Sequence, residues 1–391
     1  MKKIFLTLLL LSFGYSYSQT PKFTKNTEIS IITIGPGHLL NDSFGHNGFR
    51  IKSDNQDIVY DYGRYNFNDP NFYTNFVKGK LEYVMGSTTT NNVINYYKQQ
   101  NRTIKEQVLN LNNKQKKDLI HYLANNYKPE NRAYLYDFFY DNCATKMRDV
   151  VEIVLSGDIK YKTPVDYNKT TFRALIQENL YWNSWGSFGI DMALGSVIDK
   201  TAQPREYMFL PKYIHQFFEN ASFKSSKKPL VKTSNTIYVQ ENAFGKGSFF
   251  KSPVFILSLV SFLILYITFS DYKNQSRTKW LDSILLVTTG AIGVLLLLLW
   301  FATDHTATAY NYNLLWACPI SIIALFQVLK NTPKRWTIGY LKLLLIMLCL
   351  MVLHWCIGVQ RFAPALIPLL IALVIRYVFL IRFFSKRELN N

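Results

Sequence analysis

Cys143 is the residue of this sequence with the clearest features of a nucleophile. It is the only cysteine between residues 19 and 250, and it directly follows Asp141 and Asn142, either of which can cap a helix. Beyond it, apolar residues recur at the spacing of one helix face, at Met147, Val150, Val151, Val154 and Leu155. The sulfur is therefore expected in the first helical turn, where the helix dipole favours a thiolate and free N–H groups can hold an oxyanion. The alternative is a small buried cysteine with no chemistry.

A thiolate nucleophile needs a base, and the same segment offers four histidines: His38, His46, His121 and His215. We expect His121 on a surface helix and His215 on a peripheral one. Glycines at 45 and 48 flank His46 and allow close backbone approach, which favours His46, with His38 as its rival. Strand alternation puts His46 on the face opposite Phe49 and Ile51 unless Gly48 marks a bulge.

An acidic residue would orient that base, and the sequence offers Asp61 and Asp42 without choosing between them. No group of His, Cys, Asp and Glu has metal-ligand spacing, so we expect no metal and no cofactor.

Strands and helices must position these residues. Runs of β-branched and aromatic residues predict strands at 29–34, 45–51, 57–62, 81–85 and 103–111. An amphipathic helix is predicted over 113–127 and an extended segment over 134–140, before the helix that carries Cys143. Residues 221–250 are rich in Ser, Lys, Asn and Gly and are expected to form a linker.

The two ends of the chain predict export and membrane anchoring. Residues 1–18 have a basic start, a short apolar run and small residues before Gln19, which is typical of a cleaved signal peptide. After a domain at 19–220 and the linker, residues 251–391 contain five apolar stretches near spanning length, at about 253–270, 281–301, 314–329, 337–357 and 364–384. The sequence thus predicts an all-α bundle of five transmembrane helices.

Basic residues set the orientation of that bundle. They gather between the first and second stretches, between the third and fourth, and after the fifth, so these sites are expected in the cytoplasm and the 19–220 domain outside. Residues 19–250 hold 29 basic and 22 acidic side chains, a net charge of +7 out of +18 for the whole chain. This mildly basic balance suits a domain that rests on anionic lipid headgroups, and for an exported domain we expect no nucleic acid partner.

The two outward connections of the bundle carry polar residues that lipid packing alone does not require. His305, Asn311 and Asn313 lie in the first, and Arg361 lies in the second. They are candidates for binding a phospholipid headgroup or the acceptor amine. The alternative is an interfacial cap with aromatic anchors.

Three motifs resemble the Lnb family of lipoprotein N-acyltransferases: DSFGHNGFR at 42–50, VYDYG at 59–63 and FYDNCAT at 139–145. The similarity extends to 185–199, 208–211 and 303–316. The resemblance implies an α+β papain-like fold of the permuted NlpC type, with Cys143 as nucleophile, His46 as base and Asn142 beside the sulfur. It further implies a phospholipid acyl donor, a lipoprotein acceptor, and an inner (cytoplasmic) membrane location with the N-terminal domain in the periplasm.

Other functions fit parts of the same pattern. A papain-like cell-wall peptidase or amidase would use the same Cys–His pair, although it would need a tether rather than several spans. A phospholipid hydrolase would use the same residues with water as acceptor, and a membrane scaffold would use none of them.

Overall fold

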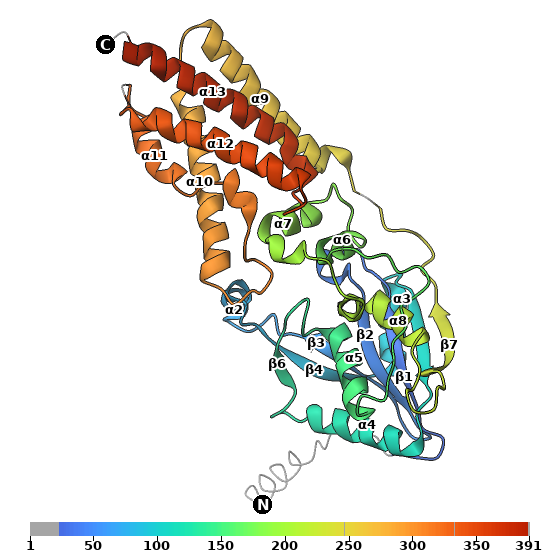
Figure 1. Ribbon diagram of the computed structural model, residues 1–391. Coiled ribbons are helices and arrows are strands. Elements are labelled where there is room, and N and C mark those ends of the chain that lie inside the picture. Colours follow the sequence, from blue (N-terminus) through green and yellow to red (C-terminus); the bar gives the residue numbers. More distant parts are fainter. Residues whose placement is uncertain (1–22, 246, 332, 390–391) are drawn as a thin grey trace, which may run out of the picture.

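The computed structural model describes residues 23–245, 247–331 and 333–389. It has a sheet-rich domain at one end and a bundle of long helices at the other (Figure 1). The expected signal peptide, residues 1–18, lies outside the described residues.

The described part of the sheet-rich domain contains a single antiparallel sheet of seven strands in the order β6-β4-β3-β2-β1-β5-β7. The strands are β1 (Glu28–Ile34), β2 (His46–Lys52), β3 (Asp57–Arg64), β4 (Glu82–Thr89), β5 (Ile104–Leu109), β6 (Ala133–Leu135) and β7 (Val231–Tyr238). The sequence predicted β1 to β5 because these segments are rich in β-branched and aromatic residues.

Helices cover both faces of this sheet. On one face, α5 (Cys143–Val154) packs with α4 (Asn113–Asn126) and α8 (Pro211–Glu219) over inward side chains such as Phe49 and Ile51. On the other face, α3 (Thr90–Gln99) covers a smaller cluster that includes Ile34 and Val59. The apolar spacing that predicted α5 is the spacing that buries Met147, Val150 and Val151 against the sheet.

The prediction of a linker over residues 221–250 is wrong for the central part of that segment. Val231–Tyr238 forms β7, which pairs with β5 at the edge of the sheet. Its middle residues are exposed, so the strand lacks the half-buried alternation by which strands are recognised. Polar side chains suit an edge strand because they oppose pairing with other chains. The sheet-rich domain therefore extends beyond residue 220.

Three shorter helices lie outside the sheet layers: α2 (Phe72–Lys78), α6 (Phe172–Gln177) and α7 (Trp185–Ala193). In Figure 1, α6 and α7 lie between the sheet and the long helices, and α2 lies at the end of α10 that is closest to the sheet. These elements form the junction between the two parts of the molecule.

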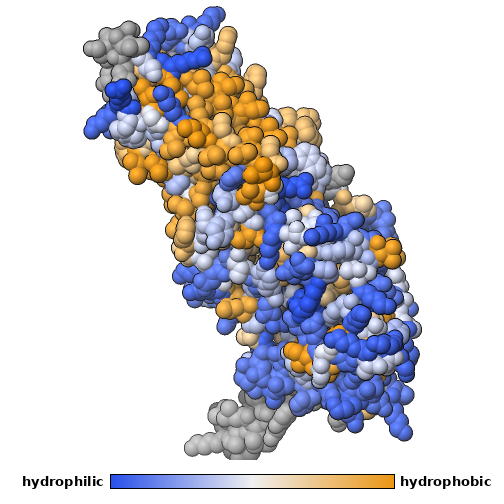
Figure 2. Space-filling model, viewed as in Figure 1, coloured by the Kyte–Doolittle hydropathy of each residue, from blue (hydrophilic) through white to orange (hydrophobic). Residues whose placement is uncertain are grey.

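Within the described residues, four helices are long and apolar enough to cross a membrane: Pro253–Lys273, Lys279–Phe301, Trp336–Cys356 and Pro364–Lys386. They correspond to α9 (Pro253–Lys273), α10 (Lys279–Phe301), α12 (Trp336–Cys356) and α13 (Ile367–Leu389). Figure 2 shows an apolar belt over these helices, with a hydrophilic cap at the end far from the sheet. The basic connections that predicted a cytoplasmic side lie at that far end.

The third apolar stretch does not form a continuous span as expected. It is divided into a short 3₁₀ helix, Tyr312–Leu315, and the eight-residue α11 (Ser321–Val328). Pro319 lies between them and cannot donate the hydrogen bond that a continuous helix needs. Gly290 and Gly293 of α10 let this broken segment approach closely, since a Cβ at Gly293 would lie 2.1 Å from the Ala317 carbonyl oxygen.

Candidate active site

Cys143 is the first residue of α5, and Asn142 caps that helix. The Asn142 side-chain oxygen accepts hydrogen bonds from the N–H groups of Ala144 and Thr145, at 2.8 and 2.9 Å. Its amide nitrogen donates to the carbonyl oxygens of Phe138 and Phe209, at 2.6 and 2.8 Å. Asn142 therefore fixes the helix start to two other segments and holds Cys143 in place. The Cys143 N–H is the first-turn donor that this cap does not use.

His46 is the first residue of β2, and Cys143 lies close enough to its imidazole to raise the pKa of that group. β2 pairs regularly with β1 from Ile34 opposite His46 onward, so the bulge considered at Gly48 is absent from this strand. His46 does lie on the face opposite Phe49 and Ile51, as alternation predicts. It meets Cys143 because it stands at the end of the strand, before the pairing of β2 with β3 begins at Gly48 and Asp61.

The irregularity lies instead in β3, between Asp61 and Arg64. In a regular strand these two residues, three apart, would point to opposite faces. A bulge at Gly63, whose φ is +94°, brings them together, so the Arg64 Nε donates to Asp61 Oδ1 at 2.6 Å. Gly86 makes room for this guanidinium, since a Cβ there would lie 2.1 Å from Arg64 Nε.

Asp61 and not Asp42 is the carboxylate that contacts the imidazole. Asp61 Oδ2 lies 3.2 Å from His46 Nε2, whereas Asp42 forms an ion pair of 3.6 Å with Arg102. His38 is exposed and its ring lies 5.6 Å from that of Phe244. The structure thus brings together Cys143, His46 and Asp61.

The electrostatics of this group favour a charged imidazole. Burial opposes protonation of His46, but the nearby Tyr97 and Cys143 and the hydrogen bond with Asp61 outweigh it and raise the pKa of His46 well above its usual value. Burial also acts to raise the pKa of Asp61, yet its bonds to His46 and its interactions with Arg64 lower that pKa overall. Both shifts favour a protonated His46 imidazole beside an ionised Asp61 carboxylate.

Two tyrosines that the sequence analysis did not select, Tyr134 and Tyr136, lie near Cys143. A Cβ built at Gly63 would be 3.7 Å from Tyr136 Cε2, 3.9 Å from Cys143 Cβ and 4.0 Å from the Tyr134 hydroxyl. Burial and the neighbouring Cys143 raise the pKa of both phenols, so both stay protonated. The Tyr134 hydroxyl is buried, with no hydrogen-bond partner among the described residues. Sequence reasoning missed it because a 134–140 extended segment gives no register for its side chains.

The outward loop between α10 and the 3₁₀ helix at 312–315 reaches the edge of this site. The Thr306 hydroxyl donates to Asp137 at 2.6 Å, and Asp137 in turn accepts from the N–H groups of Phe139 and Tyr140. The Asp304 N–H donates to the Lys78 carbonyl oxygen of α2 at 2.9 Å. His305 is half-buried, with its ring 6.4 Å from that of Phe76. The membrane part therefore contacts α2 and the segment that directly precedes Cys143.

Asn311 and Asn313 are not available as the binding residues that the sequence suggested. Asn311 donates to the carbonyl oxygens of Met192 and Ala193, and Asn313 donates to that of Asp191. Both residues are buried, and their side-chain oxygens accept bonds from within the same segment. They attach the membrane part to α7, which is a structural task.

Arg361 lies at the same junction. Its backbone N–H donates to Asp199 at 3.2 Å while the residue itself is exposed. Asp199 and Asp191 are held in turn by the fully buried Arg173. The exposed guanidinium of Arg361 stays a candidate for a lipid phosphate.

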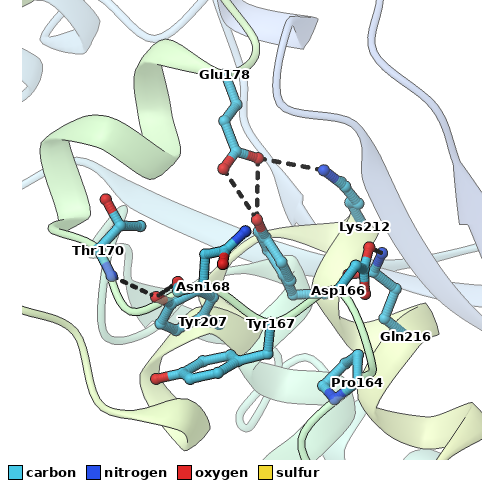
Figure 3. A pocket seen from close by; sticks show the side chains of 10 residues that line it. Pro164, Asp166, Tyr167, Asn168, Thr170, Glu178, Tyr207, Lys212 and Gln216 are labelled. Carbon is cyan, nitrogen blue, oxygen red and sulfur yellow. Dashed lines mark hydrogen bonds and ion pairs between the residues drawn. The ribbon is translucent and has the colours of Figure 1, made fainter.

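A polar pocket of about 420 Å³ lies on the sheet-rich domain (Figure 3). Glu178 accepts from Tyr213 and pairs with Lys212 on one side, and the Tyr207 hydroxyl donates to the Asn168 carbonyl oxygen. Neither Cys143 nor His46 lines it. In the parts of the chain that the structure describes, no cluster of His, Cys, Asp and Glu could hold a metal ion.

Comparison with known families gives two matches, which together span most of the chain. Residues 19–178 match the Lnb N-terminal periplasmic domain, and residues 245–388 match the Lnb transmembrane domain. No curated protein matches the chain significantly, and no solved structure does.

Proposed function

We propose that this protein is a thiol-dependent lipoprotein N-acyltransferase. The chain belongs to the Lnb family and is therefore a membrane enzyme of lipoprotein maturation. It moves an acyl chain from a glycerophospholipid, through a thioester on Cys143, to the N-terminal amine of a diacylglyceryl-cysteine lipoprotein. The observation that carries this proposal is the meeting of Cys143, His46 and Asp61 at the start of a capped helix.

In the first step the Cys143 thiolate attacks the carbonyl carbon of a phospholipid ester. A carbon–sulfur bond forms, and the ester carbon–oxygen bond breaks as the His46 imidazolium gives its proton to the departing lysophospholipid oxygen. Asp61 keeps the imidazole oriented through its 3.2 Å contact with Nε2. The acyl chain is left on the sulfur.

In the second step the now neutral His46 takes a proton from the acceptor amine as its nitrogen attacks the thioester. An amide bond forms, the carbon–sulfur bond breaks, and the thiolate and imidazolium are restored. Because a thioester is a more reactive acyl donor than the amide product, no nucleotide cofactor is required.

Both steps pass through a tetrahedral oxyanion that needs hydrogen-bond donors. The Cys143 N–H at the helix start supplies one. The buried Tyr134 hydroxyl, which stays protonated and has no partner in the described chain, is well suited to supply a second.

The membrane helices fit this reaction because both substrates are lipids held in the bilayer. We infer a multi-pass protein of the inner (cytoplasmic) membrane with its catalytic domain in the periplasm. The four apolar helices and the basic residues in the connections at the far end of the bundle support this orientation. A histidine on an early strand followed by a cysteine at a helix start is also compatible with a permuted papain-like domain. In this scheme Arg361 is a candidate for contacting a lipid phosphate at the outer interface.

Mass spectrometry of lipoprotein N-termini tests the proposal in cells. With the protein present, N-acylated diacylglyceryl-cysteine termini should accumulate, and Cys143→Ala at equal membrane level should abolish them. If the termini are the same with and without the protein, the acyltransferase function is refuted, and release of free fatty acid alone would indicate a hydrolase.

A further inference from the structure

We infer that a row of aromatic side chains between the membrane part and Cys143 binds the acyl chain of the donor phospholipid. The inference rests on the proposed function and deepens it, since it assigns a binding site for the lipid substrate. We define the aromatic row by its ring contacts, and it consists of Tyr136, Tyr83, Tyr65, Phe72, Phe67, Tyr73 and Phe76.

The row begins beside the sulfur. A Cβ built at Gly63 would lie 3.7 Å from Tyr136 and 3.9 Å from Cys143 Cβ, and Tyr136 stacks on Tyr83 with the ring centroids 4.3 Å apart. Tyr83 meets Tyr65 at 5.2 Å, and Tyr65 meets Phe72 at 5.7 Å. Each step is a direct ring contact, so no polar gap interrupts the sequence of rings.

The row ends at the membrane. Phe72 stacks on Phe76 at 6.4 Å within α2, and Phe76 meets His305 of the outward loop at 6.4 Å. That loop directly follows α10, whose last residue is Phe301. Figure 1 shows α2 at the outer end of α10, where the bilayer interface would lie. The row thus joins the level of the outer leaflet to the thiol.

The exposure of the far end indicates that it binds a ligand rather than forming a core. Phe72 is buried and anchors α2, but Phe67, Tyr73 and Phe76 are 62, 75 and 52% exposed. Clustered exposed aromatic side chains are costly in water and mark a surface that is covered in use. Lys78 of α2 is also exposed, and a cation at this end suits the phosphate of a lipid headgroup.

An acyl chain is the occupant that these features favour. The carbonyl of a phospholipid ester must reach Cys143 while its headgroup stays near the interface, and the row connects these two positions. The faces of several successive rings give apolar contact that increases with the length of the bound chain. A chain of a few carbons would meet only Tyr136 and Tyr83, whereas a long chain would also meet the α2 end.

Donor chain length gives a sharp test with the full-length protein in detergent. Thioester formation at Cys143 is measured by mass spectrometry with dipalmitoyl and with dihexanoyl phosphatidylethanolamine, and no acceptor is added. Phe76→Ser should lower the second-order rate constant of acylation by the dipalmitoyl donor by about tenfold or more while changing the dihexanoyl value little. Tyr73→Ser, a second exposed position, should act in the same direction.

Trp182→Ser is the matched control, because Trp182 is equally exposed, at 52%, but lies outside the row. It should leave the ratio of the two donors unchanged. An unchanged ratio in both row variants, or an equal change in Trp182→Ser, would overturn the inference while the proposed function stands. The inference is also overturned, and the proposed function retained, if the row variants impair only transfer to the lipoprotein, because the row would then bind the acceptor. If the unaltered protein forms no thioester with either donor, the proposed function fails, and the inference with it.

Discussion

The imidazole of His46 and the carboxylate of Asp61 lie 3.2 Å apart across neighbouring strands, and Arg64 donates to the other oxygen of that carboxylate at 2.6 Å. The contact depends on the bulge at Gly63, which turns Asp61 and Arg64 toward the same side. Asp61 is thereby fixed between two cations, and it raises the pKa of the imidazole that it contacts.

Asp61→Asn should therefore change the pH profile of the enzyme. Asp61 raises the pKa of His46, so its loss lowers that pKa, and the imidazolium needed to protonate the leaving oxygen is lost at lower pH. We expect the alkaline limb of kcat/KM to move to lower pH, with a fall of about 10²-fold or more at neutral pH. Asp42→Asn is the control, because Asp42 pairs with Arg102, and it should not move the limb. The reverse pattern would make Asp42 the orienting residue.

Tyr134→Phe removes one oxygen atom beside the sulfur. We expect kcat for acyl transfer to fall by about 10²- to 10³-fold, the range seen when one oxyanion donor is lost. The melting temperature should hardly change, because the hydroxyl has no hydrogen-bond partner in the described structure to lose. Steady-state kinetics and a thermal melt measured on the same preparation check both parts. Full activity would exclude Tyr134 from oxyanion stabilisation.

Asn142→Ala should destabilise the domain as well as the site. The substitution removes the helix cap and leaves the buried carbonyl oxygens of Phe138 and Phe209 without their donor. The expected loss is about 2 kcal/mol or more in the free energy of unfolding. Asn142→Asp keeps the acceptor that caps the helix and should lose less. Equal stability of both variants and the unaltered protein, measured by denaturant unfolding, would contradict this role.

Gly86→Ala should act on the site at a distance. The new Cβ would lie 2.1 Å from Arg64 Nε, so Arg64 must move and Asp61 loses its second partner. We expect a fall in kcat/KM that is smaller than that of Asp61→Asn. Gly189→Ala in α7 is the control, since a Cβ there meets nothing within 4 Å. Similar activity of both variants would show that Arg64 is not needed to position Asp61.

The sequence was informative where one residue pattern determines one local structure. The strands β1 to β5 follow from their β-branched and aromatic residues. The helix that begins at Cys143 follows from apolar spacing and from a capping residue at Asp141 or Asn142. The choice of Asp61 over Asp42 did not follow, because it depends on the pairing of Gly48 with Asp61 and on a bulge at Gly63. Neither cross-strand register nor a bulge can be obtained from local composition.

The errors have equally specific causes. The expected linker contains β7 because an edge strand can be polar on both faces. The third apolar stretch is hydrophobic enough to span, but Pro319 divides it, and the fit against Gly290 and Gly293 of α10 is a tertiary property. Asn311 and Asn313 were expected to bind substrate because polar residues beside a membrane suggest function, yet they join the two parts of the protein.

The most direct test of the account is to find the acyl chain on the sulfur. The full-length protein in lipid vesicles is given a phospholipid with an isotope-labelled palmitoyl chain and no acceptor, and it is then quenched in acid, digested and analysed by mass spectrometry. We predict a hydroxylamine-sensitive labelled palmitoyl group on the peptide that contains Cys143, and its disappearance when a diacylglyceryl-cysteine peptide is added. Transfer of the label to that peptide by the Cys143→Ala variant would contradict the account.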